Sequence, residues 1–341
     1  MAKLTRCENC TGELKYHPDK ELLICDRCGS GFNIKSTKGV LTRNYDPNYN
    51  PLENKSTDSL YRCSTCNSKM IIGSDVNCSR CSSCGNTTLV REKTLEVTPD
   101  GILPFKITRK KAAEIFRNWV GKRKFAPNDL VQMAKLEKIS GIYTPVYNFK
   151  YGWLFNYSAT GVEKKLDAYY NEYREETLVD KMIEGEVENE VYSASSRIPN
   201  KVIGILNDYD FRELKPFSTQ YLLGFSGVDT NVNLHKIYGE IENFVNEQNK
   251  SKATRKLNDE FDYFEDFESF AKLKNVKYNY AYVPVWANHY SYKGREYHCY
   301  INGQTGKTTG NSPKSAGKIL GTVLGILGGI GAVVLLILGL I

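Results

Sequence analysis

Cys7-Glu-Asn-Cys10, followed after fourteen residues by Cys25-Asp-Arg-Cys28, is the stretch that decides how the N-terminal part of this chain folds. The same spacing returns in Cys63-Ser-Thr-Cys66 and Cys81-Ser-Ser-Cys84, with every cysteine displaced by 56 residues. A repeat that preserves four positions at one fixed offset indicates a duplicated module rather than a chance grouping of cysteines.

The repeated cysteine pairs have the spacing of a structural zinc site. Each Cys-x2-Cys forms a tight turn that presents two thiolates, and two turns supply the tetrahedral ligand set that zinc prefers. A module of about 30 residues cannot bury enough apolar surface alone, and zinc binding of about 10–16 kcal/mol supplies the missing folding energy. We therefore predict two zinc ribbons with two structural zinc ions, held by Cys7, Cys10, Cys25, Cys28, Cys63, Cys66, Cys81 and Cys84.

The other cysteines and the start of the chain bear on this assignment. Met1–Arg6 contains no apolar run and does not resemble a secretory signal, so a reducing cytosol is expected, where clustered cysteines bind metal rather than form disulfides. Cys78 could also pair with Cys81, but the matching fourteen-residue gap favours Cys81 with Cys84. Cys299 stands between strand-like residues and is predicted to be a packed small hydrophobe.

The net charge of +7 is concentrated in one short stretch. Residues 104–124 hold eight Lys or Arg against Glu114 alone. Two interpretations of this basic stretch remain open: a solvated surface, or a patch that rests on anionic lipid head groups. Residues 1–95, with eight thiolates and two zinc ions included, are neutral and lack the counterion release that drives nucleic-acid binding, so protein contact is favoured for the ribbons.

The region from residue 94 to residue 310 has the pattern of a mixed helix-and-sheet domain. Thr108 is an N-cap for a helix that ends at Gly121, Asn128 opens a second helix, and apolar residues from Leu234 to Val245 mark a third. Residues 163–190, with ten acidic and four basic side chains, are interpreted as a solvated surface or mobile arm. Strands are predicted at Tyr143–Tyr157, Val187–Tyr192, Tyr278–Val285 and Glu296–Ile301, with a hairpin from Tyr297 to Thr309.

No catalytic motif is recognisable in the sequence. Gly303-Gln-Thr-Gly306-Lys307-Thr308 resembles a phosphate loop, but the motif requires a glycine where Ile301 stands. The four histidines occur in unrelated contexts, and no nucleophile elbow or dinucleotide fingerprint is present. The sequence therefore predicts a protein that is not an enzyme.

The run Ile319–Ile341 has no charged side chain and spans about 34 Å as a helix, enough for a bilayer core of about 30 Å. Lys307, Lys314 and Lys318 precede it, which by the positive-inside rule places the body in the cytosol. We predict a single-pass tail anchor in the cell membrane. Small residues every fourth position predict a face for helix pairing, namely Gly321, Gly325 and Gly329.

Taken together, these features predict an α+β protein with the following boundaries: ribbon 1 at 1–43, a linker at 44–59, ribbon 2 at 60–93, the α+β cytosolic domain at 94–310, a juxtamembrane linker at 311–318 and the transmembrane anchor at 319–341. The expected function is a membrane adaptor that recruits cytosolic proteins. The alternative is a membrane-tethered nucleic-acid-binding protein that uses the ribbons with the basic stretch.

The layout also resembles a bacterial family of membrane-anchored double zinc-ribbon proteins, often labelled helicase-like or phage-replication-like. The resemblance covers nearly the whole chain. It implies a role in envelope-stress assemblies of the phage-shock type, with PspA-like and SPFH-type proteins as partners. Besides the ribbons and the closing helix, it rests on Ile102-Leu-Pro-Phe-Lys-Ile107, Phe125-Ala-Pro-Asn128, Gly141-Ile-Tyr-Thr-Pro-Val146, Tyr282-Val-Pro-Val-Trp286 and Asn302-Gly-Gln-Thr-Gly-Lys307.

Overall fold

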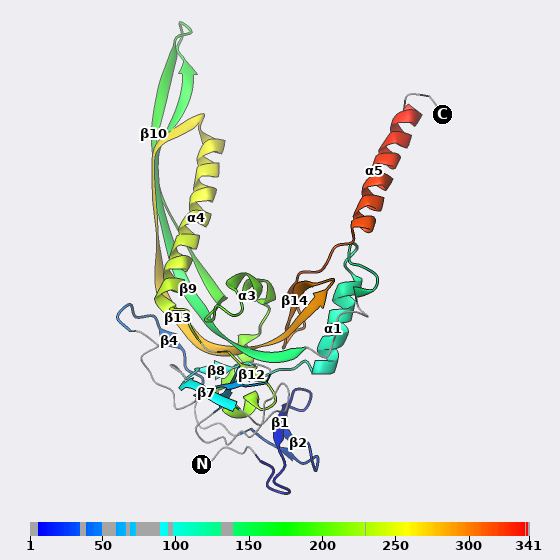
Figure 1. Ribbon diagram of the computed structural model, residues 1–341. Helices are drawn as coiled ribbons and strands as arrows, with labels where there is room; N and C mark the ends of the chain where they lie inside the picture. The colour runs from blue at the N-terminus through cyan, green and yellow to red at the C-terminus, as the bar shows by residue number, and fades with distance from the viewer. Residues whose placement is uncertain are drawn as a thin grey trace.

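A computed structural model gives the architecture of the chain, which is of the predicted mixed α+β kind (Figure 1). It carries a large sheet, two small N-terminal sheets and a C-terminal apolar helix. The structure describes residues 6–34, 39–49, 59–65, 69–72, 89–94, 98–130, 139–228, 230–337 and 339.

The large sheet is built on three very long strands. β9 (Ser140–Leu166) lies between β10 (Glu172–Ser193) and β13 (Tyr263–Tyr292), antiparallel to both. β14 (Arg295–Asn302) and β15 (Thr308–Gly310) extend the sheet beyond β13. The predicted strands all lie within these elements, but β9, β10 and β13 are far longer than the sequence pattern indicated.

The sheet is divided into a base and an arm by two bulges that face each other across β9. On one side the register between β9 and β10 shifts between Val187 and Glu190, and on the other the register with β13 shifts between Lys274 and Lys277. Asn189 and Asn275 adopt φ values of 58° and 50° at these places, a left-handed conformation that asparagine tolerates better than most residues. Because bulges bend and twist strands, the arm rises at an angle from the base (Figure 1).

The acidic segment predicted to be solvated forms most of this arm. Its residues are mainly exposed, as expected, but they are paired in a regular hairpin of β9 and β10. Asp167 builds the turn at the tip by accepting hydrogen bonds from the backbone N–H groups of Tyr169 and Asn171, both at 2.8 Å. Hydrogen bonds from the Asn171 side chain and backbone lower the pKa of Asp167, which keeps it charged in this role.

Helix α4 (Leu234–Glu260) supports the arm along its length. Its buried side chains contact Tyr147, Phe149 and Tyr278 at the base, and Phe155 and Val179 higher up. The predicted helix was correct at its start, where Asn233 caps the first turn, but α4 continues fifteen residues past Val245. Helix α3 (Asn200–Leu206) packs against the opposite face of the base, on Val146 and Ala281, whose strand neighbours Tyr147 and Tyr280 face α4.

Short elements complete the base. β8 (Gly101–Ile102) pairs with β13 and with β11 (Lys215–Pro216), whereas β12 (Ser226–Gly227) runs parallel to β9. The 3-10 helices η3 (Phe211–Glu213) and η4 (Thr219–Leu222) lie between them in the chain. Another short strand, β4 (Arg43–Asn44), also pairs with β13.

The first residues of the predicted linker are held against the base. Arg43 forms a two-pronged ion pair with the buried carboxylate of Asp100, with N–O distances of 2.6 and 2.8 Å. Tyr45 stacks on Tyr238 at a ring distance of 4.0 Å, and its hydroxyl hydrogen-bonds to His235. These contacts fix the chain as far as residue 49, and residues 50–58 lie outside the described part.

Helix α1 (Arg109–Gly121) confirms the predicted basic amphipathic helix. The Thr108 hydroxyl accepts a hydrogen bond from the Lys111 N–H at 3.3 Å, and Ala112, Phe116 and Val120 are buried. The helix predicted from Asn128 falls largely on residues 131–138, outside the described residues.

The β14–β15 hairpin confirms the predicted turn and removes the phosphate-loop interpretation. Ile301 pairs with Thr308, and the Asn302 N–H donates to the Lys307 carbonyl at 2.8 Å. A phosphate loop must lead from a strand into a helix, whereas this turn leads into another strand. Cys299 is fully buried there, which confirms its predicted packing, and burial raises its pKa to about 12.

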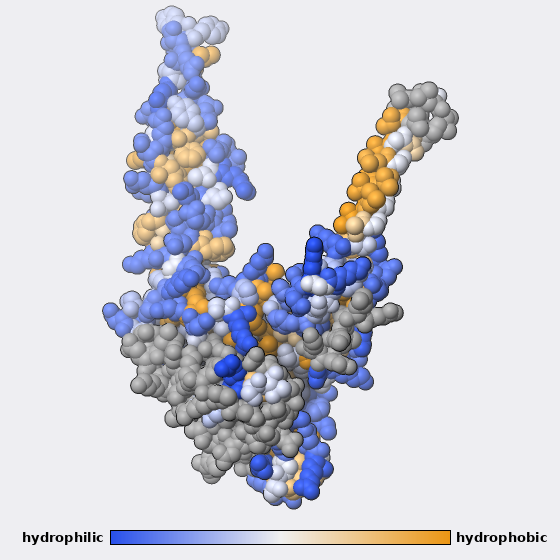
Figure 2. Space-filling view, in the orientation of Figure 1, coloured by the Kyte–Doolittle hydropathy of each residue, from blue (hydrophilic) through white to orange (hydrophobic). Residues whose placement is uncertain are grey.

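The last helix, α5 (Ala316–Ile337), projects away from the body (Figure 1). The window Ala316–Val334 is long and apolar enough to cross a membrane, and none of it is buried within the molecule. Figure 2 shows the helix as a continuous apolar surface above a largely hydrophilic body. No described atom would contact a side chain added at Gly321, Gly325 or Gly329, so their role in helix pairing stays a prediction.

Candidate metal centre

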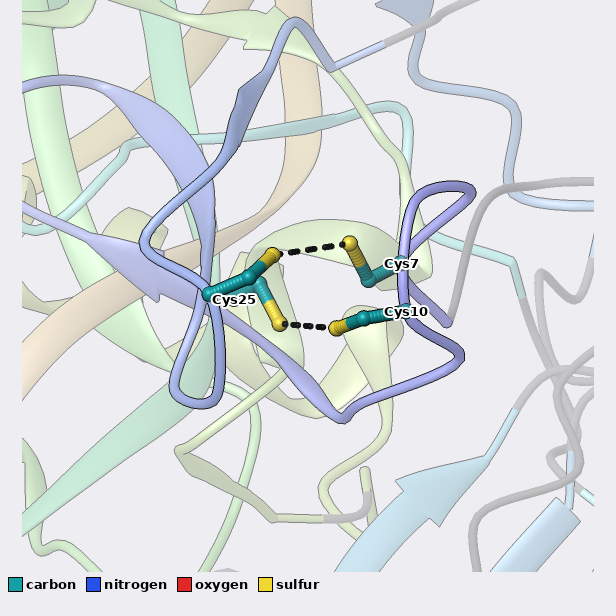
Figure 3. A group of neighbouring side chains, drawn as sticks. Cys7, Cys10 and Cys25 are labelled. Atoms are coloured by element: carbon teal, nitrogen blue, oxygen red, sulfur yellow. Dashed lines mark hydrogen bonds between the residues drawn. The ribbon is translucent and has the colours of Figure 1, made fainter.

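Four cysteines from the two predicted turns of ribbon 1 come together in space. The sulfurs of Cys7, Cys10, Cys25 and Cys28 all lie within 4.8 Å of one another. The Cys7 and Cys28 sulfurs are 3.4 Å apart and those of Cys10 and Cys25 are 3.5 Å apart. Figure 3 shows Cys7 and Cys10 side by side on one turn, facing Cys25 on the other.

The local sequence explains the shape of both turns. The Thr11 and Gly29 backbone N–H groups donate to the carbonyls of Cys7 and Cys25, at 2.8 and 2.9 Å, and close a tight loop after each pair. Gly29 has a φ of 74°, a conformation that glycine adopts without steric cost. This accounts for the glycine that follows Cys28 and, in the repeat, Cys84.

Small strands hold the turns in place. β1 (Leu14–His17), β2 (Leu22–Cys25) and β3 (Gly31–Phe32) form an antiparallel sheet, and β2 ends on a ligand residue. Gly12 lies directly beneath the sulfurs, because a Cβ atom there would come within 2.9 Å of the Cys25 sulfur. A larger residue at position 12 would therefore push the sulfurs apart.

The pKa values of Cys28 and Cys10 are shifted in opposite directions. Hydrogen bonds with the Ser30 side chain and backbone lower the pKa of Cys28 to about 6. A backbone hydrogen bond from Gly12 favours the Cys10 thiolate, but hydrogen bonding to Cys28 and burial outweigh it and raise the pKa of Cys10 to about 12. Four neighbouring thiols cannot all ionise unless a cation compensates their charge.

The donor set fits one metal ion. Zinc bound by thiolates at about 2.3 Å would place the sulfurs about 3.8 Å apart in a regular tetrahedron, close to the distances observed. With four protein ligands no coordination position is left for water, so a metal here would stabilise the fold and would not activate a substrate.

The second predicted site falls mostly outside the described residues. Cys63 is buried at the end of β5 (Ser59–Cys63), but Cys66, Cys81 and Cys84, like the spare Cys78, are not described. β5 pairs with β6 (Lys69–Ile72) and with β7 (Leu89–Thr94).

The backbone nevertheless shows part of the repeat. Arg62 and Lys69, which flank the first Cys-x2-Cys segment of ribbon 2, pair with each other. Arg6 pairs with Glu13 at the corresponding places of ribbon 1, 56 residues earlier. The two ribbons therefore share the same local pairing around this turn.

Ribbon 1 is packed firmly against the body. Tyr16 is buried, donates a hydrogen bond from its hydroxyl to the Phe105 carbonyl at 3.2 Å, and contacts the ring of Tyr221 at 5.3 Å. Its backbone N–H donates to the Leu223 carbonyl at 2.9 Å. Cys7 and Cys25 belong to the same apolar cluster as Phe105, so the metal site and the body share one core.

We expect Tyr16→Ala to weaken the whole fold. Truncating a large buried aromatic side chain costs about 3–5 kcal/mol, and here the loss would separate ribbon 1 from the body. Urea unfolding of the detergent-solubilised protein would measure it. Tyr169→Ala, at an 85% exposed position on the arm, is the matched control and should change the free energy of unfolding by less than about 0.5 kcal/mol. If the two variants changed the free energy of unfolding by the same amount, ribbon 1 and the body would not be coupled.

Sequence reasoning missed the surface that receives the ribbons. η4 contacts both β1 and β6, corresponding strands of the two repeats, and Phe225 stacks on Phe105 at 4.3 Å. The only sequence signal was the density of apolar residues in Phe217–Phe225. The histidines were also not all unrelated, because His289 lies opposite His298 on neighbouring strands, with ring centres 6.2 Å apart.

The structure thus defines a chain with a four-cysteine candidate metal centre, an α+β body and one candidate membrane span. Comparison with known proteins adds a distant relative that matches over nearly the whole chain. The chain is 24% identical to the uncharacterized protein YdjG of Bacillus subtilis (strain 168), over 95% of this chain and 94% of YdjG. No protein-family model and no solved structure matches the chain.

Proposed function

We propose that this protein is a zinc-stabilised adaptor, anchored in the cell membrane by α5, that holds cytosolic partner proteins at the membrane through its arm. The observation that carries the proposal is the combination of an exposed apolar helix with a long arm whose face opposite α4 no described residue covers. The four-cysteine centre has the donor set of a structural site, which suits a scaffold.

The exposed surface of α5 supports the anchor. Large apolar side chains are exposed on α5 from Leu320 to Val334, and Leu324 and Leu327 are each about 60% exposed. An apolar stripe of this length is rarely left in water. The arm and α5 diverge from the body in Figure 1, and the arm is too polar to enter lipid.

The arm supports partner binding. On the face opposite α4, Met182, Asn156 and Phe270 are aligned across the three strands by their pairing. Leu178 lies on the same face, four residues from Met182 along β10. Leu178, Met182 and Phe270 are 79%, 68% and 52% exposed. Apolar side chains that line one open face are typical of protein contacts, and the acidic residues around them favour a partner with a basic rim.

The resemblance noted from the sequence suggests which partners to test first. PspA-like and SPFH-type proteins of phage-shock assemblies are the candidates it implies. The relative YdjG is itself uncharacterized and assigns no partner.

Quantitative mass spectrometry of proteins that co-purify from detergent extracts tests the proposal. Met182→Glu combined with Phe270→Glu should remove at least one partner from the co-purifying set, because both charges would lie inside the contact. Phe244→Glu, at a 53% exposed position on α4, is the matched control and should leave the set intact. If the arm variant keeps every partner, the arm is not the docking surface.

A further inference from the structure

The base of α5 is hydrogen-bonded to the body beside the end of α1. The Ser315 N–H donates to the Phe125 carbonyl at 2.7 Å, and the Lys318 ammonium donates to the Ala126 carbonyl at 2.7 Å. In the segment just before α5, the Tyr290 hydroxyl donates to the Asn311 carbonyl at 3.0 Å. The loop that follows α1 is therefore held at the point where α5 begins.

This loop carries one of the two runs of three consecutive basic residues in the basic stretch. Lys122, Arg123 and Lys124 are consecutive and exposed, and Lys314 and Lys318 flank the start of α5. Among the described residues, no carboxylate lies within ion-pair distance of the three loop side chains. The Arg123 guanidinium lies over the Trp119 ring, 4.4 Å from the ring centre. This contact does not neutralise its positive charge. We call these five residues the basic collar.

The geometry separates the collar from the rest of the basic stretch. Arg109, Lys110 and Lys111 are at the opposite end of α1, about 18 Å away along the helix axis. Head groups occupy only about 5–8 Å on each side of the hydrocarbon core, and the Debye length is about 8 Å at physiological salt. Residues at the far end of α1 are therefore beyond the reach of a bilayer that surrounds α5.

We propose that the basic collar binds the anionic lipid head groups around the emergence of α5. The inference rests on the proposed membrane anchor and gives the basic stretch a role in it. An anchored helix keeps the collar at the membrane surface, so anionic lipids meet it at a high effective concentration. Contact with nucleic acid is less favoured, because only three of the eight basic residues of the stretch lie in the collar.

Lysine-reactive footprinting of the full chain in lipid nanodiscs tests the collar. Discs of phosphatidylcholine alone are compared with discs that also contain phosphatidylglycerol. In the anionic discs, Lys122, Lys124 and Lys314 should be modified about fivefold more slowly, as expected for a basic side chain at an anionic surface. Lys110 and Lys111 should react equally in both, and high salt should remove the difference.

A pair of charge-matched variants provides an independent measurement. The collar variant Lys122→Gln/Arg123→Gln/Lys124→Gln should lose the rise in melting temperature that anionic discs give the unmodified chain, because ligand binding to the folded state stabilises it. The control Lys250→Gln/Lys252→Gln/Arg255→Gln removes three exposed charges from α4 and should keep that rise.

Four outcomes would overturn the collar. Equal modification rates in both kinds of disc, with the chain embedded, would remove the collar but leave the anchor intact. If anionic discs protected Lys110 and Lys122 equally, the whole basic stretch, and not the collar alone, would bind the head groups. Protection by added DNA or RNA in neutral discs, without protection by anionic lipid, would assign the collar to nucleic acid. A chain that does not enter discs overturns the anchor and the collar together.

Discussion

Cys10→Ser is expected to release one zinc ion per chain and to unfold ribbon 1. Three thiolates and a hydroxyl cannot replace the closed tetrahedral set, and zinc binding of about 10–16 kcal/mol is folding energy in small ribbons. Because Cys7 and Cys25 lie in the same core as Phe105, the damage should extend to the body. A lower melting temperature of the whole protein is therefore expected, and not merely a frayed N-terminus.

Metal content by mass spectrometry and thermal unfolding by circular dichroism check this result on the same samples. Cys299→Ala is the matched control: this cysteine is more deeply buried than Cys10 but does not belong to the four-sulfur group, so the variant should keep its full complement of zinc. A Cys10→Ser protein that binds as much metal as the unmodified chain would rule out the candidate centre.

The second large effect is expected in the membrane anchor. Leu327→Arg combined with Ile330→Arg should move the protein from the membrane fraction to the soluble fraction, because each arginine near the middle of a spanning helix costs about 2.5–3.5 kcal/mol. Both side chains are more than half exposed and make no contact with the body. The folded body should therefore survive the change.

Carbonate extraction of membranes measures the partition directly. Leu327→Ala with Ile330→Ala removes the same side chains without adding charge, and it should leave the protein in the carbonate-resistant fraction. A double-arginine protein that resists extraction equally well would show that α5 is not what holds the chain to the membrane.

Much of the metal centre could be predicted from spacing alone. Ligand turns are local structures, in which residues such as Cys7 and Cys10 need only a few neighbours to adopt their geometry, and the 56-residue repeat showed which cysteines belong together. The cap at Thr108 and the hairpin at Asn302 were predictable for the same reason, since their hydrogen bonds span only a few residues.

The arm was not predictable in the same way. Near the tip of the arm the strands lack an alternating apolar pattern, because both faces of the hairpin are open: Glu172–Leu178 are exposed at every position, and charged residues such as Glu175 lie within a regular strand. The pairing of β9 with β13 joins residues more than a hundred positions apart, and no local propensity encodes that register. A segment that is acidic in sequence therefore became ordered sheet only through its neighbours.

By itself, the sequence determined the four-cysteine motifs, the basic amphipathic helix and the apolar C-terminal run, because each depends on residues close together in the chain. The tertiary structure alone decided that ribbon 1 shares a core with the body through Tyr16, and that Lys122–Lys124 lie at the base of α5. These placements depend on side chains that are far apart in the sequence and pack together away from water in the folded protein. The spacing of residues along the chain does not show which of them will meet.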